Sequence, residues 1–125
     1  MSFREEIKVG GAEPAGAYSR GIRIGDFLFV SGQVPRDLDT GELLGDSVAE
    51  QTRAVVGNLS RVLEAGGLSL ASVVSVTAYL QDIGDWAAFD AVYRELFSAP
   101  YPTRTTVGAN LHGVLVEISA IAASG

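Results

Sequence analysis

One stretch near the end of the chain, Val114–Ala122, reads VLVEISAIA and decides much of the fold. It predicts a β-strand, in which successive side chains point to opposite sides of a sheet. One face would hold Val114, Val116, Ile118 and Ala120, and the other would hold Leu115, Glu117, Ser119 and Ile121. Neither face is polar enough to lie against water, so we expect both faces of this sheet to be covered.

A second strand-like run, Thr103–Val107, follows Pro102 and contains Arg104. The two consecutive strands therefore each carry one charged group, Arg104 and Glu117. Burying such a group costs several kcal/mol unless it is paired. The two residues indicate either a structural ion pair or a functional site, and from charge placement alone the ion pair is the more frequent outcome.

Other segments predict the remaining elements. Two apolar runs around Gly25-Asp26 are typical of a hairpin, Ile22–Ile24 with Phe27–Val30. A capping box, Ser47 with Glu50, predicts the start of a helix that ends at Gly66-Gly67. Val73–Leu80 is typical of a strand. Asp85 is expected to cap a second helix with a buried apolar stripe of Trp86, Phe89, Val92, Tyr93, Leu96 and Phe97.

The order of these elements, strands, helix, strand, helix, strands, predicts an α+β or split βαβ domain. Right-handed crossovers place two successive helices on one face of the sheet. The other face would then be bare although it is apolar. We therefore expect that face to be buried against further copies of the chain in a closed homo-oligomer.

Length and composition exclude several classes of protein. A chain of 125 residues fits one domain, residues 1–125, with a real core. The chain has no cysteine, which excludes disulfides, thiolate metal sites and thiol nucleophiles. The net charge of -6 weighs against nucleic acid and anionic membranes as partners. No apolar run approaches about twenty residues, so we expect a soluble, unprocessed, cytoplasmic protein.

Several short motifs are spread over nearly the whole chain: Gly16–Ser19, Ser31–Pro35, Gly66-Gly67, Asp82–Trp86, Pro102–Arg104, Val116–Ile118 and Ala120–Ala122. In their order and spacing these motifs resemble the reactive intermediate deaminase family, also called the YjgF/YER057c/UK114 family. The resemblance implies a chorismate-mutase-like α+β fold, with a mixed sheet of about six strands and two helices on one face. It also implies a homotrimeric barrel with sites between subunits.

The resemblance further implies hydrolysis of 2-imino or 2-enamino acids, such as 2-aminoacrylate, to 2-keto acids and ammonia without a cofactor. Arg104 would hold the substrate carboxylate, for which a guanidinium fork is suited. Glu117 would orient the water and move protons. Tyr18 would cover the substrate, and backbone groups around Gly32 and Thr106 would complete the pocket.

The sequence departs from the family pattern at Asp90, where many members carry asparagine, and at Thr106, where many carry cysteine. A negative charge at Asp90 would disfavour a carboxylate substrate if it faced the cleft. A non-enzymatic trimer that binds small carboxylates or a protein partner remains the alternative function. A ribonuclease is disfavoured by the acidic charge. His112, the single histidine, is expected in a solvated turn. A Ser-His-Asp triad would have to use this one histidine, and a zinc site would lack both thiolates and a second imidazole, so both are disfavoured.

Overall fold

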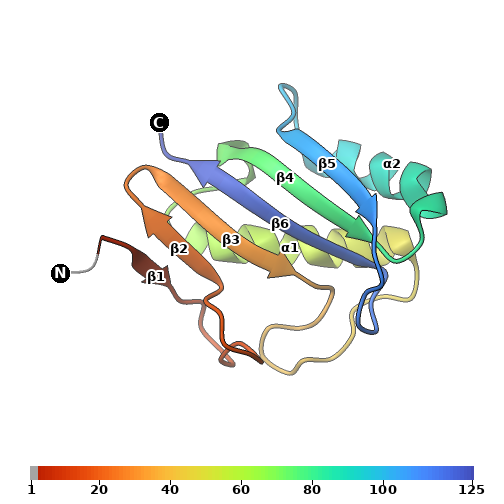
Figure 1. Cartoon of the computed structure of the whole chain (residues 1–125), viewed down its shortest axis with the longest axis horizontal. Helices are drawn as coiled ribbons and strands as arrows, with labels where there is room; N and C mark the ends of the chain where they lie inside the picture. Colours follow the sequence, from red (N-terminus) through yellow and green to blue (C-terminus); the bar gives the residue numbers. More distant parts are fainter. Residues whose placement is uncertain (1–2) are drawn as a thin grey trace.

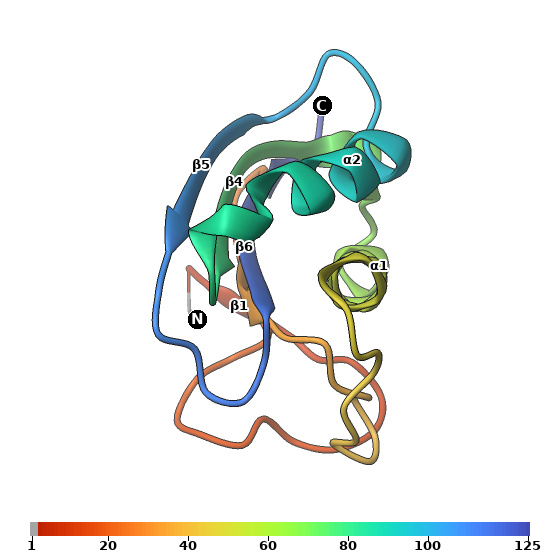
Figure 2. The same cartoon turned by 90° about the vertical axis from the view of Figure 1, so that its right-hand side faces the viewer.

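Both helices pack on the same face of one six-stranded sheet in a computed structural model of the chain, which describes residues 3–125 (Figures 1 and 2). The helices are α1 (Val48–Ala65) and α2 (Trp86–Leu96), with short 3-10 turns at Leu70–Ser72 and Ile83–Asp85. The strands are β1 (Glu5–Ile7), β2 (Gly21–Ile24), β3 (Phe27–Gln33), β4 (Val73–Leu80), β5 (Thr103–Gly108) and β6 (Val116–Ala123).

The strand order in the sheet is β1-β2-β3-β6-β4-β5. The C-terminal strand β6 lies between β3 and β4 and is antiparallel to both, so β3, α1 and β4 form a split βαβ unit. The next crossover, through α2, places β5 parallel and adjacent to β4. The predicted α+β class, the split βαβ order and the common face of the helices are confirmed.

Local signals fixed most of the boundaries. The Ser47–Glu50 capping box starts α1, and the helix ends at Gly66. Asp85 occupies the N-cap position of α2, but its side chain makes no capping hydrogen bond, so that predicted role is wrong. A 3-10 turn precedes α2 instead, and there the Asp82 carboxylate accepts a hydrogen bond from the backbone N–H of Gly84 at 2.8 Å. This turn directs the chain into α2 without a cap from Asp85.

The main core lies between the helices and the sheet. The alternation predicted for β6 is confirmed, because every second residue from Val116 onward is buried beneath the helices and the residues between them are only half-buried. The largest side chains that are almost completely enclosed include Phe89, Leu28, Leu59, Leu63 and Ile118. Apolar contact on this scale holds the helices firmly against the sheet and fixes where their side chains point.

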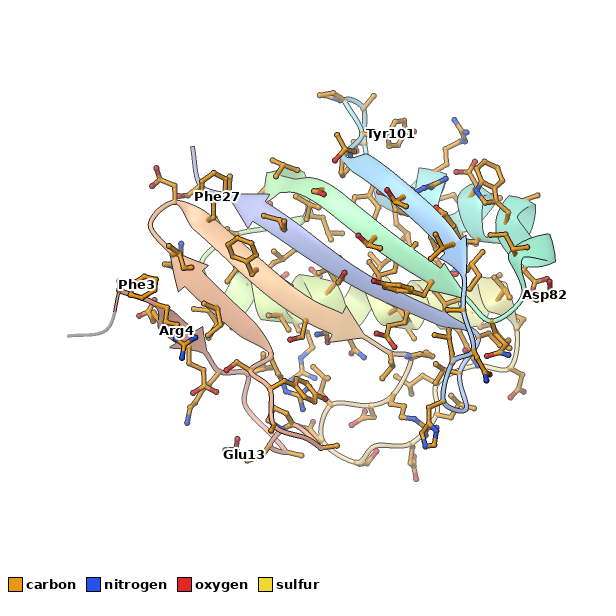
Figure 3. The ribbon with its side chains drawn as sticks, viewed as in Figure 1. Phe3, Arg4, Glu13, Phe27, Asp82 and Tyr101 are labelled. Atoms are coloured by element: carbon orange, nitrogen blue, oxygen red, sulfur yellow. The ribbon has the colours of Figure 1, made fainter. Side chains whose placement is uncertain are left out.

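The opposite face of the sheet is uncovered in the single chain, as Figure 2 shows. Phe27 and Phe29 of β3 are 49% and 43% exposed there, and Val107 of β5 is 38% exposed. Figure 3 looks onto this face and shows Phe27 at the β2–β3 hairpin. Soluble monomers rarely expose so many large apolar groups together. The bare apolar face predicted from the last strand is therefore present.

The first strand, β1, was missed by sequence reasoning. It has three residues, of which Glu5 and Glu6 are exposed and Ile7 is buried, and it pairs with β2. A charged segment this short carries no readable alternation. It forms one edge of the sheet, and β5 forms the other.

Candidate functional site

Arg104 lies on the helix-covered side of the edge strand β5 and reaches α2. Its side chain is 16% exposed. The guanidinium carbon lies over three rings of α2, 4.6 Å from the ring centroid of Tyr93 and 5.4 Å from those of Trp86 and Phe89. Such contacts favour a cation and hold a guanidinium in one orientation. Arg104 is therefore fixed in place before any ligand arrives.

These contacts correct one prediction about α2. Phe89 and Tyr93 are buried, as expected, but Trp86 is 44% exposed and is not a core residue. Its ring is one wall of the surface against which Arg104 stacks. A helical stripe indicates which face of a helix is apolar, but Trp86 begins the helix and so lies at the rim of the interface.

Asp90 is the ionic partner of Arg104. Asp90 Oδ1 lies 3.0 Å from Arg104 Nη1, and Asp90 Oδ2 lies 3.0 Å from Nη2 of Arg94 one turn further along α2. Burial alone would raise the pKa of Asp90, but the hydrogen bonds from Arg94 and Arg104 and their positive charges outweigh it and hold the pKa below its usual value. Asp90 therefore remains a carboxylate at neutral pH, and Arg104 is paired with it rather than with Glu117.

A cavity of about 300 Å³ lies next to this pair. It is lined by Asp90, Tyr93, Arg94, Tyr101, Pro102 and Arg104. Tyr101, labelled in Figure 3, belongs to the connector immediately before β5. Nearby, the hydroxyls of Tyr93 and Thr106 are buried and have no hydrogen-bond partner within residues 3–125. We call Arg104, Asp90, Arg94, Tyr93 and Thr106 the arginine half-site.

Glu117 belongs to a different part of the molecule. It lies on β6 and points to the uncovered face of the sheet, where it is half-buried. Its carboxylate lies against Gly32 of β3, next to an irregularity in the β3–β6 pairing between Val30 and Gln33. Burial raises the pKa of Glu117 above the usual glutamate value. A carboxylate with a raised pKa can exchange protons at a pH closer to neutrality.

Tyr18 lies near Gly32. It is 50% exposed, in the loop before β2, and shares with Gly32 the lining of a second hollow of about 250 Å³. We call Tyr18, Gly32 and Glu117 the glutamate half-site.

The two half-sites lie on opposite sides of one sheet. Arg104 pairs in register with Val76 of β4, which faces the helices. Glu117 pairs in register with Tyr79, three residues further along β4. Paired residues share a face, and an odd spacing along a strand reverses it. The fold therefore places Arg104 and Thr106 on one side of the sheet and Glu117 against Gly32 on the other, and a single copy does not bring the two sets together. Tyr18 joins Gly32 in lining the second hollow.

Sequence reasoning missed Arg94 and the pairing of Asp90 with Arg104. The spacing of Asp90 and Arg94, four residues apart on a predicted helix, was a usable sign of an ion pair. His112 is exposed in the turn before β6. Within residues 3–125 no three His, Asp or Glu side chains come together as a metal site. No helix in that range is both long and apolar enough to cross a membrane.

The protein is a single α+β domain in which two helices cover one face of a six-stranded sheet. An arginine is held at the edge of this sheet, and a glutamate lies on its open face. Residues 10–124 match the family model described as endoribonuclease L-PSP. The chain belongs to this family, the YjgF/RutC/Rid family, and the predicted membership is confirmed.

Three similar proteins define the relationship. A RutC family protein of Pyrococcus abyssi is 43% identical over 112 residues, which are 88% of each chain. A protein of Dermatophagoides farinae named 2-iminobutanoate/2-iminopropanoate deaminase is 30% identical over 77% of this chain and 75% of its own length. The crystal structure of RidA from an Antarctic Psychrobacter superposes with a TM-score of 0.89 at 30% identity, covering 96% of this chain and 99% of that one. The chorismate-mutase-like fold expected from the sequence is thereby confirmed.

Proposed function

We propose that this protein hydrolyses 2-imino and 2-enamino acids to 2-keto acids and ammonia, and that it does so as a homotrimer. The observation that carries the proposal is the placement of Arg104, whose guanidinium is fixed beside an open cavity. Asp90 binds Nη1, and a guanidinium has a second edge, formed by Nε and Nη2, that takes a carboxylate in two parallel hydrogen bonds. The name of the Dermatophagoides relative supports the same chemistry.

The reaction needs few groups. Water adds to the imine carbon while Glu117 takes one proton from the water and delivers it to the imine nitrogen, which gives a neutral tetrahedral carbinolamine. Glu117 then moves the proton of the carbinolamine hydroxyl to the nitrogen, the C–N bond breaks, and ammonia leaves as the C=O bond forms. Arg104 holds the carboxylate throughout, so that the imine carbon faces the water. Tyr18 covers the substrate, and the backbone at Gly32 and Thr106 completes the pocket.

Arg104 and Glu117 can serve one substrate only if they come from different copies. They project from opposite faces of the same sheet, so one copy presents its Arg104 to the cleft and the next presents its Glu117. The exposed phenylalanines of the open face supply an apolar surface for such an assembly. A trimer would then contain three equivalent sites between its subunits.

The primary test measures 2-keto acid released from imines that an amino-acid oxidase generates in situ. We expect wild type to accelerate release and Arg104→Ala to lose at least about thirtyfold in kcat/KM, because truncating one partner of a charge pair costs about 2–5 kcal/mol. Arg104→Lys should recover little, since lysine lacks the planar fork. An absence of acceleration over a broad panel of imines would refute the deaminase function.

A mixing experiment tests the shared site. Arg104→Ala and Glu117→Gln are each expected to be inactive alone. After unfolding and refolding together, about a quarter of the sites in random trimers should combine an intact Arg104 from one copy with an intact Glu117 from the next. Activity recovered on mixing supports the two-copy site. Activity that stays absent on mixing, with both variants assembled, would show that each copy works alone.

The Asp90–Arg104 contact favours a second candidate function, the binding of a ligand without its conversion. An arginine that is already paired with a carboxylate can still bind a ligand through its second edge. In that case the protein is a non-enzymatic trimer that binds small carboxylates or a protein partner. Thermal stabilisation by 2-keto acids without any turnover of imines would favour it.

The ribonuclease named in the family model's description has less support here. A net charge of -6 disfavours the approach of a polyphosphate backbone. Strong RNA binding that weakens steeply with salt would be needed to establish it.

A further inference from the structure

Asp90 divides its two oxygens between two arginines that line the same cavity. Arg104 is 16% exposed and Arg94 is 67% exposed, so Asp90 contacts one enclosed and one solvated cation. The charged groups lining the cavity are these three residues, two positive and one negative, and their net charge is +1. A ligand with one negative charge would therefore neutralise the charge of the cavity lining.

The aromatic surroundings of Arg104 strengthen the effect of charge on ligand binding in this cavity. The aromatic rings of α2 exclude water from one side of the Arg104 guanidinium, and charge interactions are stronger where water is excluded. One carboxylate on the free edge of Arg104 neutralises the site. A second carboxylate in the same cavity would be repelled by the Asp90 carboxylate, and the lining residues within 3–125 include no further enclosed cation to compensate this repulsion.

We propose that Asp90 is a specificity-determining residue that restricts the arginine half-site to small monocarboxylates and excludes dicarboxylates. This inference rests on the proposed function in taking the cavity beside Arg104 as the carboxylate site. It goes further by assigning the class of side chain on the imino acid: apolar or neutral rather than acidic. Asp90 also positions Arg104, since it holds Nη1 and leaves the Nε–Nη2 edge for a ligand.

The test is calorimetric binding of two stable 2-keto acids, pyruvate as the monoanion and 2-oxoglutarate as the dianion. We expect wild type to bind pyruvate at least about tenfold more tightly than 2-oxoglutarate. Asp90→Asn keeps the shape and an oxygen for Arg104 Nη1 but removes the charge, and it should reduce the pyruvate preference by about tenfold. Asp90→Glu keeps the charge and should retain the preference.

Glu95→Gln is the matched control, because it removes one negative charge from the same helix at an exposed residue paired with Arg53 outside the cavity. It should leave the preference unchanged. The inference is overturned if wild type binds 2-oxoglutarate as tightly as pyruvate, if neither probe binds, or if Asp90→Asn and Glu95→Gln behave alike. Because binding is measured without turnover, a failure of the deaminase assay would not be confused with a failure of this selectivity.

Discussion

The carboxylate of Glu117 lies directly against the backbone of Gly32. A Cβ atom built on Gly32 would overlap Glu117 Oε2, closer than real Cβ atoms come to other groups, and would lie 3.0 Å from the carboxyl carbon of Glu117. The space that Glu117 occupies on the open face of the sheet therefore exists because residue 32 has no side chain. A glycine that sequence reasoning assigned to substrate approach also accommodates the glutamate proposed to be catalytic.

Gly32→Ala should displace the Glu117 carboxylate. The displaced group is the end of a flexible side chain, so we expect the fold to persist and the rate of imine hydrolysis to fall at least about tenfold, since a shift of about 1 Å in a catalytic group costs this much or more. Keto-acid release and thermal unfolding measure the two effects. Unchanged activity with a folded protein would show that the position of Glu117 does not matter.

Gly57→Ala is the matched glycine substitution and is expected to stabilise the protein. Gly57 lies in the middle of α1, is exposed, and has open space where a Cβ would be added. Alanine at such a helical position gains about 0.5–1 kcal/mol in the free energy of unfolding. Urea unfolding measures it, and a loss of stability would mean that the site is crowded by another copy.

The pH dependence of stability should carry a contribution from Glu117. Its pKa is raised by burial in the folded chain and returns to the ordinary value, 4.5, on unfolding. Between these two values the folded state binds more protons, so the free energy of unfolding falls as the pH rises through this range.

Glu117→Gln does not titrate and should remove this fall, so that it is more stable than wild type above the raised pKa. Urea unfolding of both proteins from about pH 4 to pH 8 tests the expectation. Parallel pH profiles for the two proteins would contradict it.

Asn58→Ala should destabilise the segment that follows β3. The Asn58 side chain is buried in α1, and its Nδ2 donates hydrogen bonds to the backbone oxygens of Val34 at 2.9 Å and Arg36 at 2.8 Å. In the variant the Arg36 carbonyl loses this donor, and the Val34 carbonyl keeps only the hydrogen bond from the backbone N–H of Arg36, at a total cost of about 1–3 kcal/mol. Ser60→Ala on the same helix removes an exposed contact to Glu64 and should cost less than about 0.5 kcal/mol. Equal losses in the two variants would contradict a specific role for Asn58.

Phe29→Lys should dissociate the assembly. Phe29 is 43% exposed on the open sheet face of a single copy, so lysine is compatible with folding but places a charge in the proposed interface. Sedimentation velocity should show monomers for this variant and trimers for wild type. Leu43→Lys adds the same charge at a residue equally exposed in the loop before α1 and should remain trimeric. If the Phe29→Lys variant remained trimeric, the interface between subunits would have to lie on another surface of the chain.

The sequence allowed the sheet faces and most element boundaries to be predicted because those signals are local. The two-residue period of β6, the capping box of α1 and the hairpin turn at Gly25 each depend on neighbours in the chain. Arg104 and Glu117 stood out because a charge in an apolar strand is unusual in any tertiary setting.

The contacts of these two residues were not predictable in the same way. Whether Asp90 meets Arg104 depends on where α2 crosses the edge of the sheet. The approach of Glu117 to Gly32 depends on the register between β3 and β6, which is irregular just there. Both relationships join residues far apart in the chain, and neither leaves a periodic pattern that a single sequence reveals.

The two edges of the sheet also differ in a way that bears on aggregation. β5 is a six-residue strand, whereas β1 has three residues, two of them exposed glutamates. A strand approaching β1 finds few backbone groups to pair with and two exposed glutamates, Glu5 paired with Arg23 of the neighbouring strand and Glu6 beside it. Fibril growth by edge-to-edge stacking requires both edges of every molecule to accept a neighbour. The short acidic strand β1 therefore disfavours the addition of a further strand at this edge and lowers the tendency of the protein to stack into fibres.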